Sequence, residues 1–246
     1  MKMLGLGRGL TGAHNKPYAR RVAGLVLWLR ADLPSTVHTD AHGVYQWDDL
    51  SGLLHHATQS TDSYKPGYTS GLSVDFTAAD VHHLLANAVA AYCAGEHQPI
   101  TVVAVYECTV DGSVQTLFAF GSSTDTDPLH LVYADYSTNA LLGLRRDDVG
   151  TLAAIVSLTP TSSGILDDVF ATPWTRTITV NGTPAAQNQD VGVLTTNTFS
   201  IGAIVRATAS VGLNGKIKEF LVYNRGLIAP ELTFLRTVLN AKWLVY

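Results

Sequence analysis

The most specific indication of the fold is the stretch GLNGKIKEFLVYNRGLIAP, residues 212–230. It begins as a β-type run, turns at Asn224–Gly226 and reaches a proline that suits the first turn of a helix. Simple alternation places Ile217, Glu219, Leu221 and Tyr223 on one face of the strand and Lys218, Phe220 and Val222 on the other. Apolar residues on both faces predict a strand in the middle of its sheet.

A short amphipathic helix is predicted directly after this strand. Glu231 follows Pro230 and complements the positive end of the helix dipole. One apolar stripe, at spacings of three and four, is formed by Leu232, Leu235, Leu239 and Trp243. Burial of such side chains contributes roughly 1.5–3 kcal/mol each. We therefore expect the helix to pack as a plug on the edge of the β domain.

The rest of the chain is predicted to be almost entirely β. Short runs rich in β-branched residues recur between clusters of Gly, Asp, Ser and Thr; they include GLVLWLRAD (24–32), ITVVAVYEC (100–108) and RTITVNG (176–182). Strands at this spacing are typical of a sandwich or jelly roll, and no β–α alternation indicates a parallel sheet. One further segment, residues 78–95, is predicted to form a helical turn or two.

Length and charge divide the chain into an arm and one domain. The 246 residues, 46% hydrophobic and 15% charged, suit a single folded unit. Residues 1–21 contain five cationic residues, Lys2, Arg8, Lys16, Arg20 and Arg21, and no anionic one. We predict a basic flexible arm over residues 1–21 and a jelly-roll domain over residues 22–246. Because the net charge is −4, the domain carries −9, which argues against nucleic-acid binding.

Targeting and cysteine patterns indicate a soluble protein made in a reducing cytoplasm. The N-terminus lacks the sustained apolar core of a secretion signal. The run AGLVLWL is far shorter than the roughly 20 residues that span a bilayer. Cys93 and Cys108 are expected to be thiols, and the sequence leaves their pairing open.

The C-terminal motif resembles that of concanavalin A-like, laminin-G-like jelly-roll domains found in phage and bacterial proteins. The matching residues are Gly215, Ile217, Glu219, Val222, Tyr223, Asn224 and Arg225 in the strand, and Leu239, Lys242 and Trp243 in the helix. The upstream segments LVLWLRAD, VYQWDDLSG, SVDF, ITVVAVYE, ITVNG and FSIGA follow in the expected order. The resemblance spans residues 24–243 and implies two antiparallel sheets. It departs at the helix cap, where IAP replaces the usual Ser or Thr.

The sequence does not predict an enzyme. Glycosidases that share this architecture need paired carboxylates, whereas the four glutamates are isolated and Glu219 belongs to the motif. The aspartate pairs at 48–49, 147–148 and 167–168 are interpreted as turn residues. No serine-nucleophile elbow, phosphate loop or zinc motif occurs, so no catalytic residue and no cofactor are predicted.

Two kinds of ligand site remain open. Calcium is the candidate metal, since laminin-G-like domains sometimes bind it, and its candidate ligands are Asp48, Asp49 and Asp80. The nine histidines are interpreted as loop residues. A glycan platform is the second candidate, formed by the aromatic residues Tyr64, Tyr68, Tyr133, Tyr136 and Trp174.

The resemblance, together with the lack of a predicted catalytic residue, leads to two hypotheses for the function. The favoured hypothesis is a non-enzymatic virion protein of a tailed phage, such as a capsid decoration, head-fibre, tail or baseplate-associated subunit. It would be made in the host cytoplasm, form a homo-oligomer, bind other virion proteins through its arm and present a lectin-like jelly roll to a cell-surface glycan. The alternative is a bacterial carbohydrate-binding module.

Overall fold

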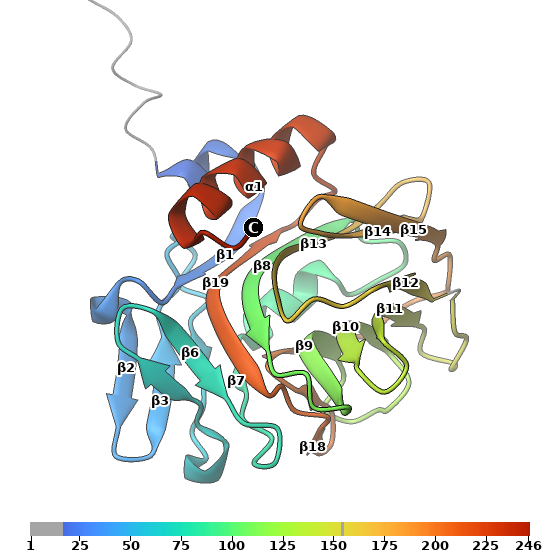
Figure 1. The fold of residues 1–246 in the computed structure, drawn as a ribbon. Helices are drawn as coiled ribbons and strands as arrows, with labels where there is room; N and C mark the ends of the chain where they lie inside the picture. Colours follow the sequence, from blue (N-terminus) through green and yellow to red (C-terminus); the bar gives the residue numbers. More distant parts are fainter. Residues whose placement is uncertain (1–16, 154) are drawn as a thin grey trace, which may run out of the picture.

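The computed structural model describes residues 17–153 and 155–246, which form two facing antiparallel β-sheets and one α-helix (Figure 1). Sheet A contains, in spatial order, β15 (Thr183–Asn188), β14 (Thr175–Val180), β13 (Ser163–Ala171), β8 (Ile100–Cys108), β19 (Gly215–Tyr223), β6 (Ser73–Phe76) and β5 (Gly67–Thr69), and β1 (Leu25–Arg30) also pairs with β19. The predicted all-β sandwich of two antiparallel sheets with a C-terminal helix is confirmed.

Sheet B is the second layer. It contains β12 (Val156–Leu158), β11 (Ala140–Arg146), β10 (Leu129–Asp135), β9 (Val114–Gly121), β16 (Thr198–Ile201), β7 (Leu84–Leu85), β4 (Ala57–Thr58), β3 (Gly43–Trp47) and β2 (Val37–Asp40). A separate hairpin is formed by β17 (Ile204–Val205) and β18 (Ala209–Ser210). The 3-10 helices are η1 (Tyr18–Arg21), η2 (Pro34–Thr36), η3 (Asp62–Tyr64) and η4 (Asn87–Tyr92), of which η4 confirms the short helix predicted within residues 78–95.

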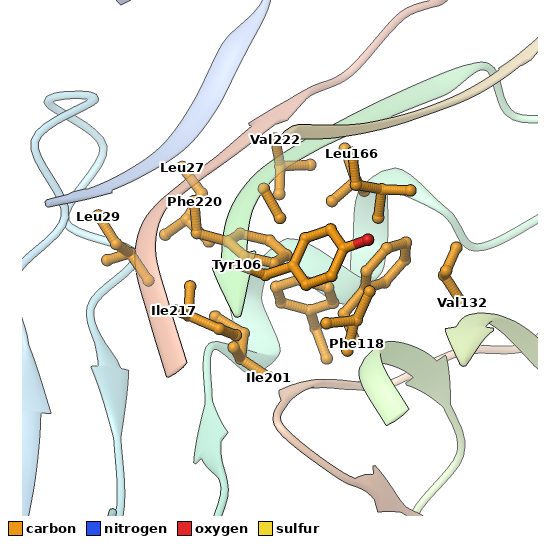
Figure 2. Packing of buried hydrophobic residues seen from close by; sticks show 14 of the residues in the cluster. Leu27, Leu29, Tyr106, Phe118, Val132, Leu166, Ile201, Ile217, Phe220 and Val222 are labelled. Carbon is orange, nitrogen blue, oxygen red and sulfur yellow. The ribbon is translucent and has the colours of Figure 1, made fainter. Parts of the chain in front are cut away.

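The core lies between the two sheets (Figure 2). Sheet A contributes side chains such as Leu27, Leu29, Phe220 and Val222, and sheet B contributes others such as Phe118, Val132 and Ile201. Alternation along each strand produces this arrangement, since every second side chain faces inward. As predicted, β19 is a central strand, with β8 on one side and β6 and β1 on the other.

The predicted division of β19 into two faces is wrong at one end, because the strand contains a β-bulge. Ile217 pairs with Tyr106, and Glu219 pairs with the next residue, Val105, so Lys218 is the extra residue. Ile217 therefore joins Phe220 in the inner core rather than Glu219 on the outer face.

Helix α1 (Ala229–Trp243) covers the outer face of sheet A (Figure 1). Leu232, Leu235 and Leu239 are buried as predicted and pack against outward-facing residues of β1, β8, β13 and β19. The predicted position on an edge is therefore wrong: the outer face offers several strands of apolar surface, and the helix buries it. The cap lacks a side-chain hydroxyl, but the backbone N–H of Ile228 donates to the carboxylate of Glu231 (3.1 Å).

The last residues of the predicted arm belong to the domain. Ala19 of η1 is fully buried in the cluster beneath α1, and the hydroxyl of Tyr18 donates to Glu219. The boundary predicted at residue 21 thus falls inside packed structure.

A pair of truncations tests this placement of η1. We expect a chain lacking residues 1–21 to be less stable than one lacking residues 1–16, by about 2 kcal/mol, because only the longer deletion removes a hydrogen bond to a buried carboxylate. Urea unfolding of both proteins measures the difference. Equal midpoints and slopes would show that η1 contributes nothing.

Strand β13 was not predicted, and it corrects the interpretation of Asp167 and Asp168 as turn residues. Both are fully buried near the middle of this strand, pointing to opposite faces of sheet A. Asp168 points between the sheets and binds Arg176, while Asp167 lies under α1, 3.0 Å from Nε of Arg236. Burial raises the pKa of Asp167 to about 6, and the charge of Arg236 opposes the rise. Two acidic residues in succession masked this strand, which pairs with β14 directly after it and with β8 about sixty residues before it.

Candidate functional site

Part of the outer face of sheet A is left open by α1, and a groove of about 440 Å³ lies there. It is lined by the loop after β1, the β5–β6 turn, β8, β19 and the end of α1: Asp32, Thr69, Gly71, Leu72, Ser73, Glu107, Lys216, Lys218, Lys242 and Trp243. We call it the lysine–tryptophan groove. It combines an indole ring, three ammonium groups and two carboxylates within one hollow.

Strand β19 supplies two of these lysines, Lys216 and Lys218. Lys216 lies opposite Glu107 in the ladder between β19 and β8. The extra residue, Lys218, then reaches the same outer face, where its Nζ lies 2.5 Å from Oε1 of Glu107. Regular alternation would also place these two lysines on one face, opposite Ile217. The bulge adds Glu219 to the same outer face, directly after Lys218, while Ile217 and Phe220 both stay in the inner core.

A buried carboxylate beneath the groove fixes the residues supplied by α1. Glu219 is fully buried. Its Oε2 accepts hydrogen bonds from Nζ of Lys242 (2.8 Å) and Nε1 of Trp243 (2.8 Å). Its Oε1 accepts from Nε1 of Trp28 (2.7 Å) and from the hydroxyl of Tyr18. Glu219 therefore joins β1, β19, η1 and α1, and holds the indole of Trp243 in one orientation.

The indole ring of Trp243 is partly exposed and has cations beside it. Nζ of Lys242 lies 4.5 Å from the ring centroid and Nζ of Lys218 lies 5.9 Å from it. These distances are within the range of cation–π attraction. The ring is thus held from below by Glu219 and flanked by two ammonium groups.

The charges of the groove are mostly paired. Lys242 binds Asp32 (2.8 Å), which also receives two hydrogen bonds from Arg30 (3.0 and 2.6 Å). Burial alone would raise the pKa of Asp32, but the hydrogen bonds from Arg30 and Lys242 outweigh it and lower this pKa. Lys216 is exposed and, within the described chain, forms no ion pair. Among the three groove lysines, Lys216 is thus the one without a carboxylate partner in the described chain.

A second hollow of about 440 Å³ adjoins the groove. It shares Glu107 and Lys216 and is otherwise lined by Cys108, Thr109, Ser162, Ser163 and Gly215. The two hollows together extend the polar surface along β8 and β19. Lys216 therefore lies between two adjoining hollows.

The predicted tyrosine platform is not assembled. Tyr64 lies in η3, with its ring centroid 5.1 Å from that of His83, and Tyr133 lies in β10 against the outer cluster of sheet B. Tyr68 of β5 and Tyr136 after β10 pack against the main core and donate to the carbonyls of Ala31 (2.8 Å) and Thr161 (3.3 Å), respectively. The four rings therefore pack against different parts of the domain.

Trp174 lies in the β13–β14 turn and is only partly exposed. Its ring stacks on that of His97, with centroids 3.9 Å apart and planes 16° apart. His97 in turn lies 2.5 Å from the carboxylate of Asp190. One face of the predicted Trp174 site is thus covered by His97.

The predicted calcium ligands hold loops together. The carboxylate of Asp49 is buried and accepts the backbone N–H groups of Trp28 (2.9 Å) and His55 (3.0 Å) and the hydroxyl of Ser51 (2.6 Å). Asp48 accepts from His38 (2.8 Å), and Asp80 is exposed, 3.6 Å from His82. Across residues 17–153 and 155–246, no group of three or more His, Cys, Asp or Glu is placed to hold a metal ion. The three aspartates do not converge.

Of the five cationic residues of the predicted arm, two lie in the domain and three lie outside the described residues. Arg20 donates from Nε and Nη2 to the carbonyl of Leu50 (3.0 and 2.6 Å), and Arg21 lies beside it in η1. Lys2, Arg8 and Lys16 lie outside the described residues.

Cys93 and Cys108 are both buried free thiols. In the described part of the chain, no helix has the length and apolar character needed to cross a membrane.

The C-terminal motif accounted for Lys242 and Trp243 as residues of the fold and did not indicate a groove. One signal was present: three of the chain's six lysines lie between residues 216 and 242. No local sequence pattern indicated that Thr69, Ser73 and Glu107 line the groove. The strands that carry them are distant in sequence from β19 and α1.

Comparisons with known proteins bear on the fold. No model of a known protein family and no curated protein sequence matches this chain. Among solved structures, the chain is similar to a Trypanosoma rangeli sialidase (14% identity, TM-score 0.60, covering 91% of this chain and 34% of that one). It is also similar to the NanB sialidase of Streptococcus pneumoniae (16% identity, TM-score 0.55, 66% and 27%).

A third neighbour is a smaller domain. The CBM40 domain of the Ruminococcus gnavus IT-sialidase, solved with α2,3-sialyllactose, has 17% identity, a TM-score of 0.50 and coverage of 57% of this chain and 83% of that one. The chain thus spans about a third or less of the two sialidases and most of the CBM40 domain. At these identities the similarity establishes a shared β-sandwich fold.

Proposed function

We propose that this chain is a non-catalytic carbohydrate-binding module and that the lysine–tryptophan groove is its sugar site. The observation that carries the proposal is the groove itself: a partly exposed indole ring, Trp243, beside hydrogen-bonding and charged side chains in an open hollow. Sites of this kind bind through apolar contact with a ring and a few polar groups that fix orientation. The fold shared with a CBM40 domain supports the same function.

The groove residues have complementary roles in this proposal. The apolar face of a sugar ring packs on the indole of Trp243, which Glu219 holds in place. Lys216, Lys218 and the carboxylate of Glu107 supply donors and an acceptor to sugar hydroxyl groups. Because Lys216 has no ion pair among the described residues, the groove favours a sugar that carries an acidic group over a neutral one.

The carboxylates of the groove suit binding better than glycoside cleavage. A glycosidase needs a carboxylic acid with a raised pKa to protonate the leaving group. Hydrogen bonds from Arg30 and Lys242 overcome the effect of burial and lower the pKa of Asp32 instead. Glu107 is engaged by Lys218 at 2.5 Å. Both observations support a non-enzymatic role.

The virion role, its homo-oligomer and the attachment of the arm to other virion proteins stay predictions. Such a role is compatible with a sugar-binding surface, since a particle subunit of this kind would present its sandwich to cell-surface glycans. The bacterial carbohydrate-binding module has the stronger support, because a neighbour of the same fold is described as one.

Charge reversal at Lys216 tests the sugar site. After a glycan array identifies a ligand, we expect Lys216→Glu to weaken its binding at least about tenfold in calorimetry, a loss of about 1.4 kcal/mol. Lys216 is exposed, so the variant should fold normally. Arg206→Glu is the matched control, since it makes the same charge change on the β17–β18 hairpin and should bind like the parent. Equal loss in both variants, or in neither, would refute this site, and release of free sugar by the purified protein would refute the non-catalytic role.

A further inference from the structure

A second polar cluster lies between the two sheets, apart from the groove. It contains His130 of β10, Arg145 of β11, Asp168 of β13 and Arg176 of β14, and all four side chains are fully buried. We call it the interior ionic cluster. Buried charges in proteins are normally paired, because an unpaired buried charge is strongly destabilising.

Arg176 shows how a guanidinium is satisfied at this depth. Its Nε and Nη2 donate to the two oxygens of Asp168 (2.7 and 2.9 Å), in the bidentate arrangement that carboxylates favour. Its Nη1 donates to the carbonyl of Leu144 (2.8 Å), and its Nη2 also donates to the carbonyl of Leu131 (2.8 Å). Every nitrogen of Arg176 therefore has an acceptor.

Arg145 presents the same edge without a carboxylate. Its Nη1 lies 3.3 Å from Nδ1 of His130, and its Cζ lies 4.1 Å from the centroid of the Phe170 ring. The Cys93 thiol also interacts with this guanidinium, but Nε and Nη2 have no partner of hydrogen-bond geometry among the described residues. These two nitrogens form the edge that, in Arg176, holds a carboxylate.

The charges of the cluster leave one positive charge uncompensated. Asp168 balances Arg176. His130 is neutral, since burial, with the charge of Arg176 as the next contribution, lowers its pKa to about 3. Burial also raises the pKa of the nearby Cys93 thiol, so this side chain supplies no negative charge at neutral pH.

We propose that the Nε and Nη2 edge of Arg145 binds a small monovalent anion, of which chloride is the representative, between the two sheets. One negative charge neutralises the cluster, whereas a dianion would leave it negative. The full burial of Arg145 favours a compact ion over an organic carboxylate. The anion would serve the stability of the sandwich and is independent of sugar binding.

Thermal unfolding in matched salts tests the anion site. At constant ionic strength, replacing sodium methanesulfonate with sodium chloride or bromide should raise Tm saturably, by roughly 5–10 °C when the halide exceeds its dissociation constant a hundredfold. Arg145→Met should abolish this response. Arg146→Met is the matched control and should keep it, because Arg146 instead binds the carbonyl of Asp127 (2.7 Å). Identical melting in all salts, or an unchanged halide response in Arg145→Met, would overturn the proposal.

Bromide diffraction keeps the test decisive if Arg145→Met does not fold. Crystals of the parent protein grown in sodium bromide should show an anomalous peak within hydrogen-bond distance of Nε and Nη2 of Arg145. A peak elsewhere on the protein only, or ordered water at this edge, would refute the anion site.

Discussion

Replacing Glu219 with alanine is expected to destabilise the protein by about 3–5 kcal/mol, the usual cost of removing one partner of a buried ion pair. The substitution leaves Nζ of Lys242 and the indole N–H groups of Trp28 and Trp243 without the acceptor that they share. The effect should include loosening of α1 and η1, since both are bound to this carboxylate. Urea unfolding measures the loss, and hydrogen exchange of the α1 amides locates it.

Glu107→Ala is the matched control for this prediction. Glu107 is a partly exposed glutamate of the same groove with a single lysine partner, and its loss should cost less than about 1 kcal/mol. Equal effects of the two substitutions would show that Glu219 does not organise the outer layer.

Replacing Asp168 with alanine is expected to have a comparable effect, about 3–5 kcal/mol, because it leaves the buried guanidinium of Arg176 without its carboxylate. The double variant Asp168→Leu with Arg176→Met should be markedly more stable than Asp168→Ala, since it removes both charges of the pair. Differential scanning calorimetry at neutral pH measures both. The control is Asp190→Ala, which removes an exposed aspartate paired with His97 and should cost less than about 1 kcal/mol.

A small loss in Asp168→Ala would contradict this prediction. It would mean that the ion pair of Asp168 with Arg176 contributes little to stability.

Much of the fold could be predicted because it depends on local patterns. The β-branched run of β8, the apolar run of β1 and the leucine stripe of α1 each determine an element within one stretch of sequence. The Asn181–Gly182 turn also followed from local chemistry, since both residues adopt positive φ (50° and 85°), which this pair accommodates readily.

The candidate site could not be predicted in the same way. The bulge at Lys218 results from pairing with β8, more than a hundred residues away, and it decides which side chains reach the outer face. Likewise, nothing near Asp168 in the sequence shows that His130 and Arg145 are its neighbours. Long-range pairing of strands thus produced the features that sequence patterns missed.

Glu219 contributes both to the stability of the fold and to the proposed sugar site. Its carboxylate stabilises the packing of η1 and α1 on sheet A, and it also orients the ring of Trp243 in the groove. The residue that the sequence assigned to a fold motif therefore also prepares the proposed sugar surface.

An NMR titration with the glycan identified on the array tests whether the lysine–tryptophan groove is the sugar site. The indole N–H signals of Trp28, Trp47, Trp174 and Trp243 report on different parts of the molecule. We predict that saturating ligand shifts the Trp243 signal and the backbone amides of Lys216 and Lys218, while the Trp174 signal stays in place. Shifts centred on Trp174, with Trp243 unchanged, would show that the sugar binds elsewhere and would contradict the account.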